Sequence, residues 1–314
     1  MSPVHRDHSA DTAVDVMEHL PRSGSASAGG LASGFSPKHT LPVRVELRRQ
    51  LHRRRTQLAL AFMVLLPVIL AIAFAFDSGQ PDSGSRESTS PGSSFVDLAK
   101  QGATNFAIVA MFFAASFLLV VVVSLFFGDT VASEASWSSL RYLLAMPVPR
   151  NRLLRQKFLV AALLSLVAVV LLPVAAWVLG AIVYGTGPVT TPLGLTFGGW
   201  SALGRLAIVV GYVAISLLWV AGLAFLLSVC TDAPLGAVGG SVLLAILSQI
   251  LNQIEALGGI RDWLPTHYAF AWTGAMVDPI RWDDMVRGSF SSLLYGTIFT
   301  ALAFWRFNRK DITS

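Results

Sequence analysis

The chain has 314 residues, of which 54% are hydrophobic and 13% are charged, and its mean hydropathy is +0.63. Soluble domains carry roughly 25% charged residues, so this composition excludes a chain built only of soluble domains. The net charge of +5 comes from basic residues that cluster beside apolar blocks, which indicates membrane topology and not nucleic-acid binding. The single cysteine excludes an intrachain disulfide and a thiolate metal cluster.

The first part of the chain predicts a tail followed by a helix on the membrane surface. Residues 1–41 are polar and Ser/Gly-rich, and we expect a disordered cytoplasmic tail without a secretory signal peptide. In residues 42–56, Val43, Leu47 and Leu51 recur every four positions, which predicts an amphipathic interfacial helix. A stop-transfer cluster that only sets topology explains the same basic residues, and the two interpretations are compatible. The residues expected at the inner leaflet are Arg48, Arg49, Arg53, Arg54 and Arg55.

The transmembrane domain is predicted over residues 57–311. Six stretches are long and apolar enough, or nearly so, to form helices across a bilayer core of about 30 Å. Pro67 and Pro173 fall inside two of them, where neighbouring helices can compensate for a kink. Only Thr231–Ala233 separates the fourth span from the fifth, so we expect a tight hairpin there. The predicted spans cover residues 57–76, 104–127, 158–184, 206–230, 234–254 and 288–305.

The distribution of Lys and Arg predicts the orientation. Nine precede the first span, five lie between Gly128 and Lys157, and three follow the sixth span, whereas six lie on the other side. Basic residues favour the cytoplasmic side, so both termini are expected in the cytoplasm of a multi-pass protein of the cell membrane. Residues 77–103 are then a polar outer loop. Residues 255–287 are rich in aromatic residues, and we expect short interfacial or re-entrant helices there, before the last span.

The interiors of the predicted spans contain no Asp, Glu, Lys, Arg or His. Secondary transporters usually place ionisable groups along the pathway, so this absence counts against ion-coupled transport. The chain also has no phosphate-binding loop, because none of its lysines follows a glycine. Ser201 and His267 are the few candidates for an intramembrane enzyme, and Ser201 lies in a predicted loop. We therefore expect a non-catalytic protein with no catalytic or metal-binding residues.

The connection between the second and third spans predicts a short helix, a rigid turn and a return to the membrane. Trp137, Leu140 and Leu144 follow one another at i, i+3 and i+7, so they share one face of an amphipathic helix. Pro147 and Pro149 end this helix, because proline disfavours an α conformation in the residue before it. A basic helix then leads into the third span.

This connection resembles the same segment in the membrane subunits of ABC-2-type exporters. That family often shows a Glu, then Gly-Thr-Leu four residues later, Leu-Leu, Pro-Val-Ser-Arg, two aliphatic residues and a Lys. The spacing is the same here, with Ser138, Ser139 and Pro149 in place of Gly, Thr and Ser. The resemblance covers roughly residues 45–311. The matching residues are Glu134, Leu140, Leu143, Leu144, Pro147, Val148, Arg150, Leu153, Leu154 and Lys157.

The resemblance implies an all-α bundle of six spans with a cytoplasmic coupling helix that docks into a separate ABC ATPase subunit, present in two copies. ATP and Mg would be bound by that partner, and this chain would need no cofactor. Six spans form half of the usual pathway, which implies a homodimer or a heterodimer with a second permease, surrounded by membrane lipids. The coupling residues implied are Glu134, Trp137, Leu140, Arg141, Leu144, Pro147, Arg150 and Lys157.

The expected function is therefore export of a hydrophobic or amphipathic substrate across a bacterial plasma membrane, driven by ATP hydrolysis in the partner. Three other classes stay open. A non-transporting membrane partner of an ATPase would share the coupling helix but move no cargo. An intramembrane enzyme would need a catalytic pair at membrane depth. A secondary transporter would work on an ion gradient without an ATPase.

Overall fold

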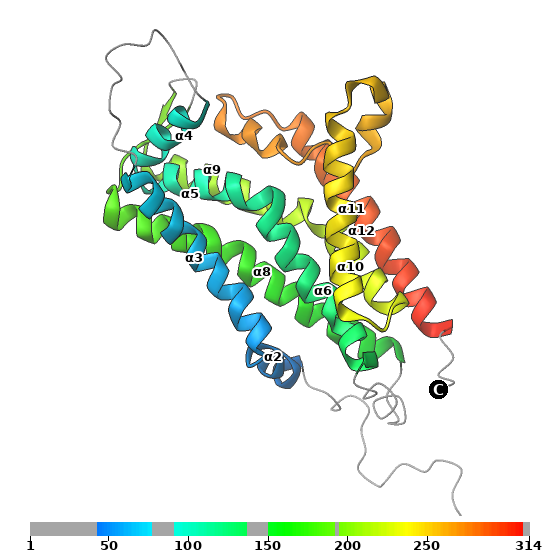
Figure 1. Cartoon of the computed structure of the whole chain (residues 1–314). Helices are drawn as coiled ribbons and strands as arrows, with labels where there is room; N and C mark the ends of the chain where they lie inside the picture. Colours follow the sequence, from blue (N-terminus) through cyan, green and yellow to red (C-terminus); the bar gives the residue numbers. More distant parts are fainter. Residues whose placement is uncertain (1–42, 77–90, 137–149, 192–194, 310–314) are drawn as a thin grey trace, which may run out of the picture. The chain divides into compact units, whose positions relative to one another are not determined.

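The structure is a computed structural model that describes residues 43–76, 91–136, 150–191 and 195–309. Helices make up nearly all of it, and the predicted all-α class is confirmed except for one hairpin of two-residue strands (Figure 1). In chain order the elements are α2 Val43–Leu51, α3 Arg54–Phe76, α4 Pro91–Lys100, α5 Ala103–Phe113, η2 Ala114–Leu118, α6 Leu119–Ser136, α8 Arg150–Val183, β1 Val189–Thr190, β2 Thr196–Phe197, α9 Gly199–Ser216, α10 Leu218–Cys230, α11 Pro234–Gln253, η3 Glu255–Trp263, η4 Ala271–Met276 and α12 Asp283–Arg309.

Five helical segments in the described part of the chain are long and apolar enough to cross a membrane, which is the composition of a polytopic membrane protein. The sixth predicted span, 288–305, lies inside α12. That helix is 27 residues long, but it does not belong to the five. Its apolar residues alternate with Ser, Thr, Gly and Tyr, which lowers its hydropathy. The five segments are Arg54–Phe76, Ala103–Glu134, Asn151–Val183, Gly199–Cys230 and Pro234–Gln253.

Helices extend beyond several of the predicted spans and carry charge with them, as the second and fourth spans illustrate. The second was predicted to end at residue 127, but α6 continues to Ser136. The fourth was predicted to begin at residue 206, but α9 begins at Gly199. The helices thus include Asp129, Glu134 and Arg205, all three buried. An apolar run in the sequence shows which part of a helix can lie in a membrane, but it does not show where the helix ends. The helix continues past the apolar run where its charged side chains have partners in the fold.

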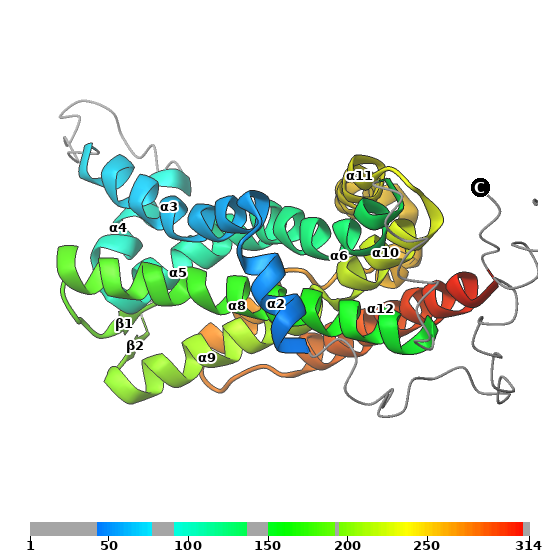
Figure 2. The ribbon, with the colours of Figure 1, turned by 90° about the horizontal axis from the view of Figure 1, so that it is seen from below.

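The segment from α5 to α6 occupies the middle of the helix packing. α5 packs on α8, and α6 packs on α8, α10 and α11 (Figures 1 and 2). α10 has its largest contact with α12, where two glycines allow the backbones to approach. A Cβ added at Gly222 would lie 2.6 Å from the carbonyl oxygen of Gly296, and one added at Gly296 would lie 2.8 Å from that of Leu218. α12 is therefore fixed against α10 by backbone proximity.

A π-helical turn, η2, separates α5 from α6 without ending the rod. Such a turn contains one extra residue and leaves carbonyl groups poorly paired. One of them, the carbonyl oxygen of Ser116, accepts a hydrogen bond of 2.9 Å from Nε2 of Gln249 on α11. The amide in α11 therefore compensates for the widened turn by a hydrogen bond between helices.

The aromatic segment before α12 contains two 3-10 helices, η3 and η4, where short interfacial or re-entrant helices were expected. A buried arginine on α9 holds η4 in place. The Arg205 guanidinium donates to the carbonyl oxygens of Ala275 at 2.6 Å and Val277 at 2.7 Å. It also lies 3.7 Å from the centre of the Phe197 ring in β2. Arg205 thus joins α9, the β-hairpin and η4, and its burial is compensated by these contacts.

Candidate functional site

The charged residues at the junction of α2, α3, α6 and α8 form the most organised polar site in the described part of the chain. We call this site the charged junction. It comprises Arg49 on α2, Arg53 and Arg55 around the start of α3, Asp129 and Glu134 on α6, and Lys157 on α8.

Glu134 and Lys157 form its buried half. Lys157 Nζ lies 2.6 Å from Glu134 Oε1, and both side chains are only 5% exposed. Lys157 also donates to the carbonyl oxygen of Thr130 at 3.3 Å. A buried charge is strongly destabilising unless it is paired and hydrogen-bonded, so these two residues depend on each other. The pair joins the last turns of α6 to the third turn of α8.

Arg49 connects the surface helix to the same carboxylate. Its Nη2 donates to Glu134 Oε1 at 2.8 Å and to Glu46 Oε1 at 2.9 Å. Burial by itself lowers the pKa of the Arg49 guanidinium, but the hydrogen bond to Glu134 and the charges of Glu46 and Glu134 outweigh it and raise the pKa above its ordinary value. The guanidinium therefore stays charged, and α2 is held against the bundle by an ion pair.

Asp129 forms the second half of the junction, on α6 just over one turn before Glu134. Arg53 Nη1 lies 3.0 Å from Asp129 Oδ2, and Arg55 Nη1 pairs with Asp129 Oδ1. The carboxylate is buried, whereas both arginines reach solvent. Two cations on one carboxylate hold the start of α3 against the end of α6, in the same way that Glu134 holds α2.

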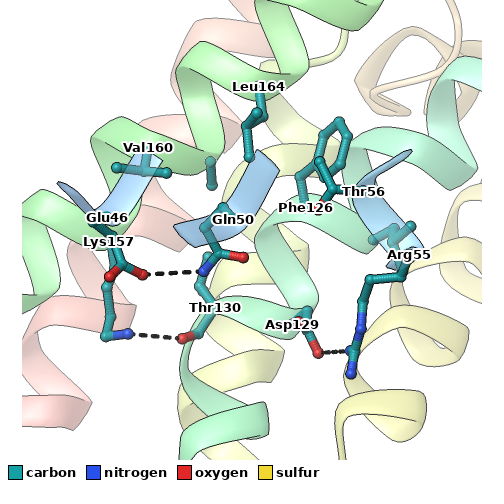
Figure 3. A pocket seen from close by; sticks show the side chains of 12 residues that line it. Glu46, Gln50, Arg55, Thr56, Phe126, Asp129, Thr130, Lys157, Val160 and Leu164 are labelled. Carbon is teal, nitrogen blue, oxygen red and sulfur yellow. Dashed lines mark hydrogen bonds and ion pairs between the residues drawn. The ribbon is translucent and has the colours of Figure 1, made fainter. Parts of the chain in front are cut away.

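A small cavity of about 20 Å³ lies between the two halves (Figure 3). Its lower wall in the view is polar, with Lys157 directed at Thr130 and Arg55 directed at Asp129, while apolar residues such as Phe126 and Leu164 lie above. This volume holds about one water molecule and no organic ligand. The charged junction is thus a structural joint and not a pocket for substrate.

The expected inner-leaflet arginines divide into two groups. Arg49, Arg53 and Arg55 turn toward the carboxylates of the junction. Arg48 and Arg54 are exposed and have no ion-pair partner among the described residues, and their contact with the inner leaflet stays a prediction.

The expected coupling residues are described only at the two ends of the connection. Glu134 and Lys157 are brought together as described above. Arg150 is the first residue of α8. The central residues Trp137, Leu140, Arg141, Leu144 and Pro147 lie outside the described residues.

Sequence reasoning did not identify Asp129 or Glu46 as members of the site. Asp129 lies two residues after the predicted end of the second span, and its partners are more than 70 positions earlier in the chain. The sequence feature that could have identified Asp129 is a single acid directly after an apolar run, on the side of the membrane where arginine is predicted to be in excess. Such an acid requires a basic partner if the helix continues.

The catalytic candidates have separate partners. Ser201 Oγ donates to the carbonyl oxygen of Gly198 at 2.7 Å. His267 Nδ1 lies 2.9 Å from Asn252 Oδ1, and His267 Nε2 lies 3.4 Å from Asp262 Oδ1. Among the described residues, no group of three or more His, Cys, Asp or Glu side chains is arranged to hold a metal ion.

Comparison with known proteins places most of this architecture in one family. A family model described as "Protein of unknown function (DUF2705)" matches residues 68–313, which include Asp129, Glu134 and Lys157 but not α2. The chain is also similar to "Uncharacterized protein YhcI" of Bacillus subtilis (strain 168), with 26% identity over 196 residues. That similarity covers 59% of this chain and 61% of the relative, so this chain spans less than two thirds of the relative's length.

Proposed function

Starting from the fact that the chain belongs to the DUF2705 family, a family of unknown function, we propose that it is the membrane-spanning subunit of an ATP-driven exporter of the ABC-2 type. In this proposal the connection between α6 and α8 docks on a separate ATPase subunit, and a second permease completes the pathway. The α12 helix serves as the sixth span, so that both termini lie in the cytoplasm.

The observation that carries the proposal is the buried ion pair between Glu134 and Lys157. These are the first and last residues of the motif that resembles ABC-2 exporters, and they lie 2.6 Å apart. The connection therefore leaves and re-enters the bundle at one point. A loop can transmit a displacement from a partner subunit to the helices only if its two ends are held rigidly. Flexible ends would take up the displacement themselves.

The packing supports transmission from that base into the rest of the protein. α6 packs on α10 and α11, α8 packs on α3 and α5, and Arg49 links α2 to the same carboxylate. Closure of two ATPase subunits around ATP would displace both connections, and these helices would move with them. ATP supplies the bias because it binds the closed ATPase pair more tightly than the open one.

Co-purification tests the docking. Replacing Leu140 and Leu144 together by Asp is expected to abolish co-purification with the proposed ATPase subunit, since the apolar face of the predicted coupling helix would carry two charges. Leu235→Asp is the matched control, because Leu235 is an exposed leucine at the start of α11 and lies outside the connection. Retained binding in the double variant, with wild-type membrane insertion, would refute the docking.

Transport in reconstituted vesicles separates the exporter from the other classes. ATP-dependent movement of cargo that requires both the chain and the ATPase is expected. Movement on an ion gradient without the ATPase would favour a secondary transporter, and ATPase binding without any cargo movement would favour a non-transporting partner.

A further inference from the structure

The surface helix α2 buries little of its surface against the bundle. It lies across α8 (Figure 2), and no residue of α2 is fully buried. Two residues that are not helical, His52 and Arg53, separate α2 from α3. The residues that face the bundle follow one another at i, i+3, i+4 and i+7, and each is only partly buried: Val43, Glu46, Leu47 and Gln50. Little apolar surface would therefore become exposed if α2 moved away from the bundle.

The outward face of α2 combines arginine with apolar side chains. Arg44 and Arg48 are one turn apart, both are exposed, and neither has an ion-pair partner among the described residues. Val45 is 62% exposed and Leu51 is 38% exposed, and at about 100° per residue all four lie on one continuous side of the helix. Such a face is suited to a membrane surface, because its apolar side chains can enter the acyl boundary while its guanidinium groups pair with phosphate.

Arg49 lies at the border between the two faces. Its position on the helix falls between Val45 on the outward side and Glu46 on the inward side. Its guanidinium reaches Glu46 at 2.9 Å and Glu134 at 2.8 Å, yet the side chain remains 48% exposed. An ion pair with a half-exposed partner contributes little to stability, so an anion on the outward side can compete for this arginine.

Arg49 can leave Glu134 without leaving a buried charge unpaired. Lys157 stays 2.6 Å from the same carboxylate, with both side chains 5% exposed. The start of α3 is held separately, because two arginines of that segment pair with Asp129. Release of Arg49 would thus free α2 alone, while α3, α6 and α8 stay joined at the charged junction.

We propose that α2 binds anionic phospholipid headgroups through Arg44, Arg48 and Arg49, and that Arg49 exchanges Glu134 for a lipid phosphate. α2 is docked on the bundle in a neutral bilayer and released onto the membrane surface in an anionic one. Its release removes one of the two cations from Glu134, at the base of the connection between α6 and α8. The inference does not depend on the exporter proposed above, since it concerns only α2 and lipid.

The distance between two spin labels tests the proposal on the full chain in nanodiscs. One label is attached at Val45→Cys on α2 and the other at Leu159→Cys, an exposed position of α8, in a Cys230→Ser background. In phosphatidylcholine we expect the docked distance. Replacing about a third of the lipid by phosphatidylglycerol should add a longer distance and raise the ratio of released to docked molecules about tenfold, because three arginines near an anionic surface outweigh one half-exposed ion pair.

Soluble anions distinguish a lipid headgroup from free phosphate. Inorganic phosphate and glycerol 3-phosphate, each added to phosphatidylcholine nanodiscs, should leave the docked distance unchanged, because they do not create the surface potential of an anionic bilayer. Release of α2 by either soluble anion would overturn the assignment to lipid.

Two arginine variants locate the exchange. Arg49→Gln should raise the released fraction in phosphatidylcholine about three- to fivefold, since the pair with Glu134 is lost while Lys157 keeps that carboxylate paired. Arg48→Gln is the matched control, because it removes the same charge from the neighbouring position but breaks no ion pair. It should stay docked in phosphatidylcholine and respond less than the wild type to phosphatidylglycerol.

The lipid comparison needs no change at any arginine, so it stands even if a variant fails to fold. Identical distance distributions in the two lipids would overturn the proposal. An Arg49→Gln variant that stays docked in phosphatidylcholine to the same extent as the wild type would overturn it as well, since Arg49 would then not be what holds α2 in place.

Discussion

Glu134→Gln removes the charge of the carboxylate at the centre of the charged junction while keeping its shape. The consequence follows from burial: Lys157 is 5% exposed, and after the substitution its charge faces only an amide and the carbonyl oxygen of Thr130. Breaking a buried ion pair on one side is destabilising by about 3–5 kcal/mol. We therefore expect Glu134→Gln to lower the free energy of unfolding by about 3 kcal/mol.

The expected loss of stability in the companion variants depends on which buried charge each variant leaves without a partner. Lys157→Met should be less destabilising than Glu134→Gln, because Glu134 keeps Arg49 as a partner at 2.8 Å. The double variant should recover part of the loss, since no unpaired buried lysine remains. Glu46→Gln is the matched control: its partner Arg49 is 48% exposed, and exposed pairs contribute about 0–1 kcal/mol.

Unfolding by SDS in mixed micelles, followed by tryptophan fluorescence, measures these differences. The reasoning would be refuted if Glu134→Gln cost no more than Glu46→Gln, or if the double variant were less stable than Glu134→Gln alone.

Three further predictions concern other parts of the bundle. Gly222→Ala should lower stability by about 1–3 kcal/mol in the same unfolding assay, because the new Cβ meets the Gly296 backbone, whereas Gly211→Ala, with open space around it, should not. Arg205→Lys should speed hydrogen exchange in η4, measured by mass spectrometry, since a lysine lacks the second nitrogen that reaches Asp278 and the planar group that lies over Phe197; unchanged exchange would show that η4 does not need the guanidinium. Asp129→Asn should speed exchange at the start of α3, where two arginines lose their carboxylate, and an effect confined to α6 would contradict this.

The helices of this fold could be predicted from local composition, because each apolar run is long enough to mark its own helix. The Thr231–Ala233 turn was found in this way, and α11 begins at Pro234 as expected. The ends of α6 and α9 could not be predicted, since they depend on partners far away in the sequence. Arg49 and Glu134, for example, are 85 positions apart.

The candidate site could likewise be predicted only in part from the local sequence. The motif placed Glu134 and Lys157 at the two ends of one connection, but spacing alone does not say that such residues meet. Their contact depends on α6 and α8 packing side by side, which is a property of the whole bundle. A second cavity, of about 310 Å³, could not be predicted from the sequence for a similar reason, because α4, α5, the hairpin and η4 each contribute only a few residues to it.

The π-helical turn Ala114–Leu118 lies between the two ends of one rod. One residue of α-helix corresponds to about 100° of rotation, but a π turn takes up one extra residue without changing the orientation of the helix beyond it. Deleting Ala115 should therefore restore a regular α-helix and leave Asp129 and Glu134 facing their arginines, whereas deleting one residue within regular α5 or α6 should rotate the two ends of the rod against each other by about 100°. The widened turn is thus a place where this rod can change its length by one residue without disturbing the charged junction.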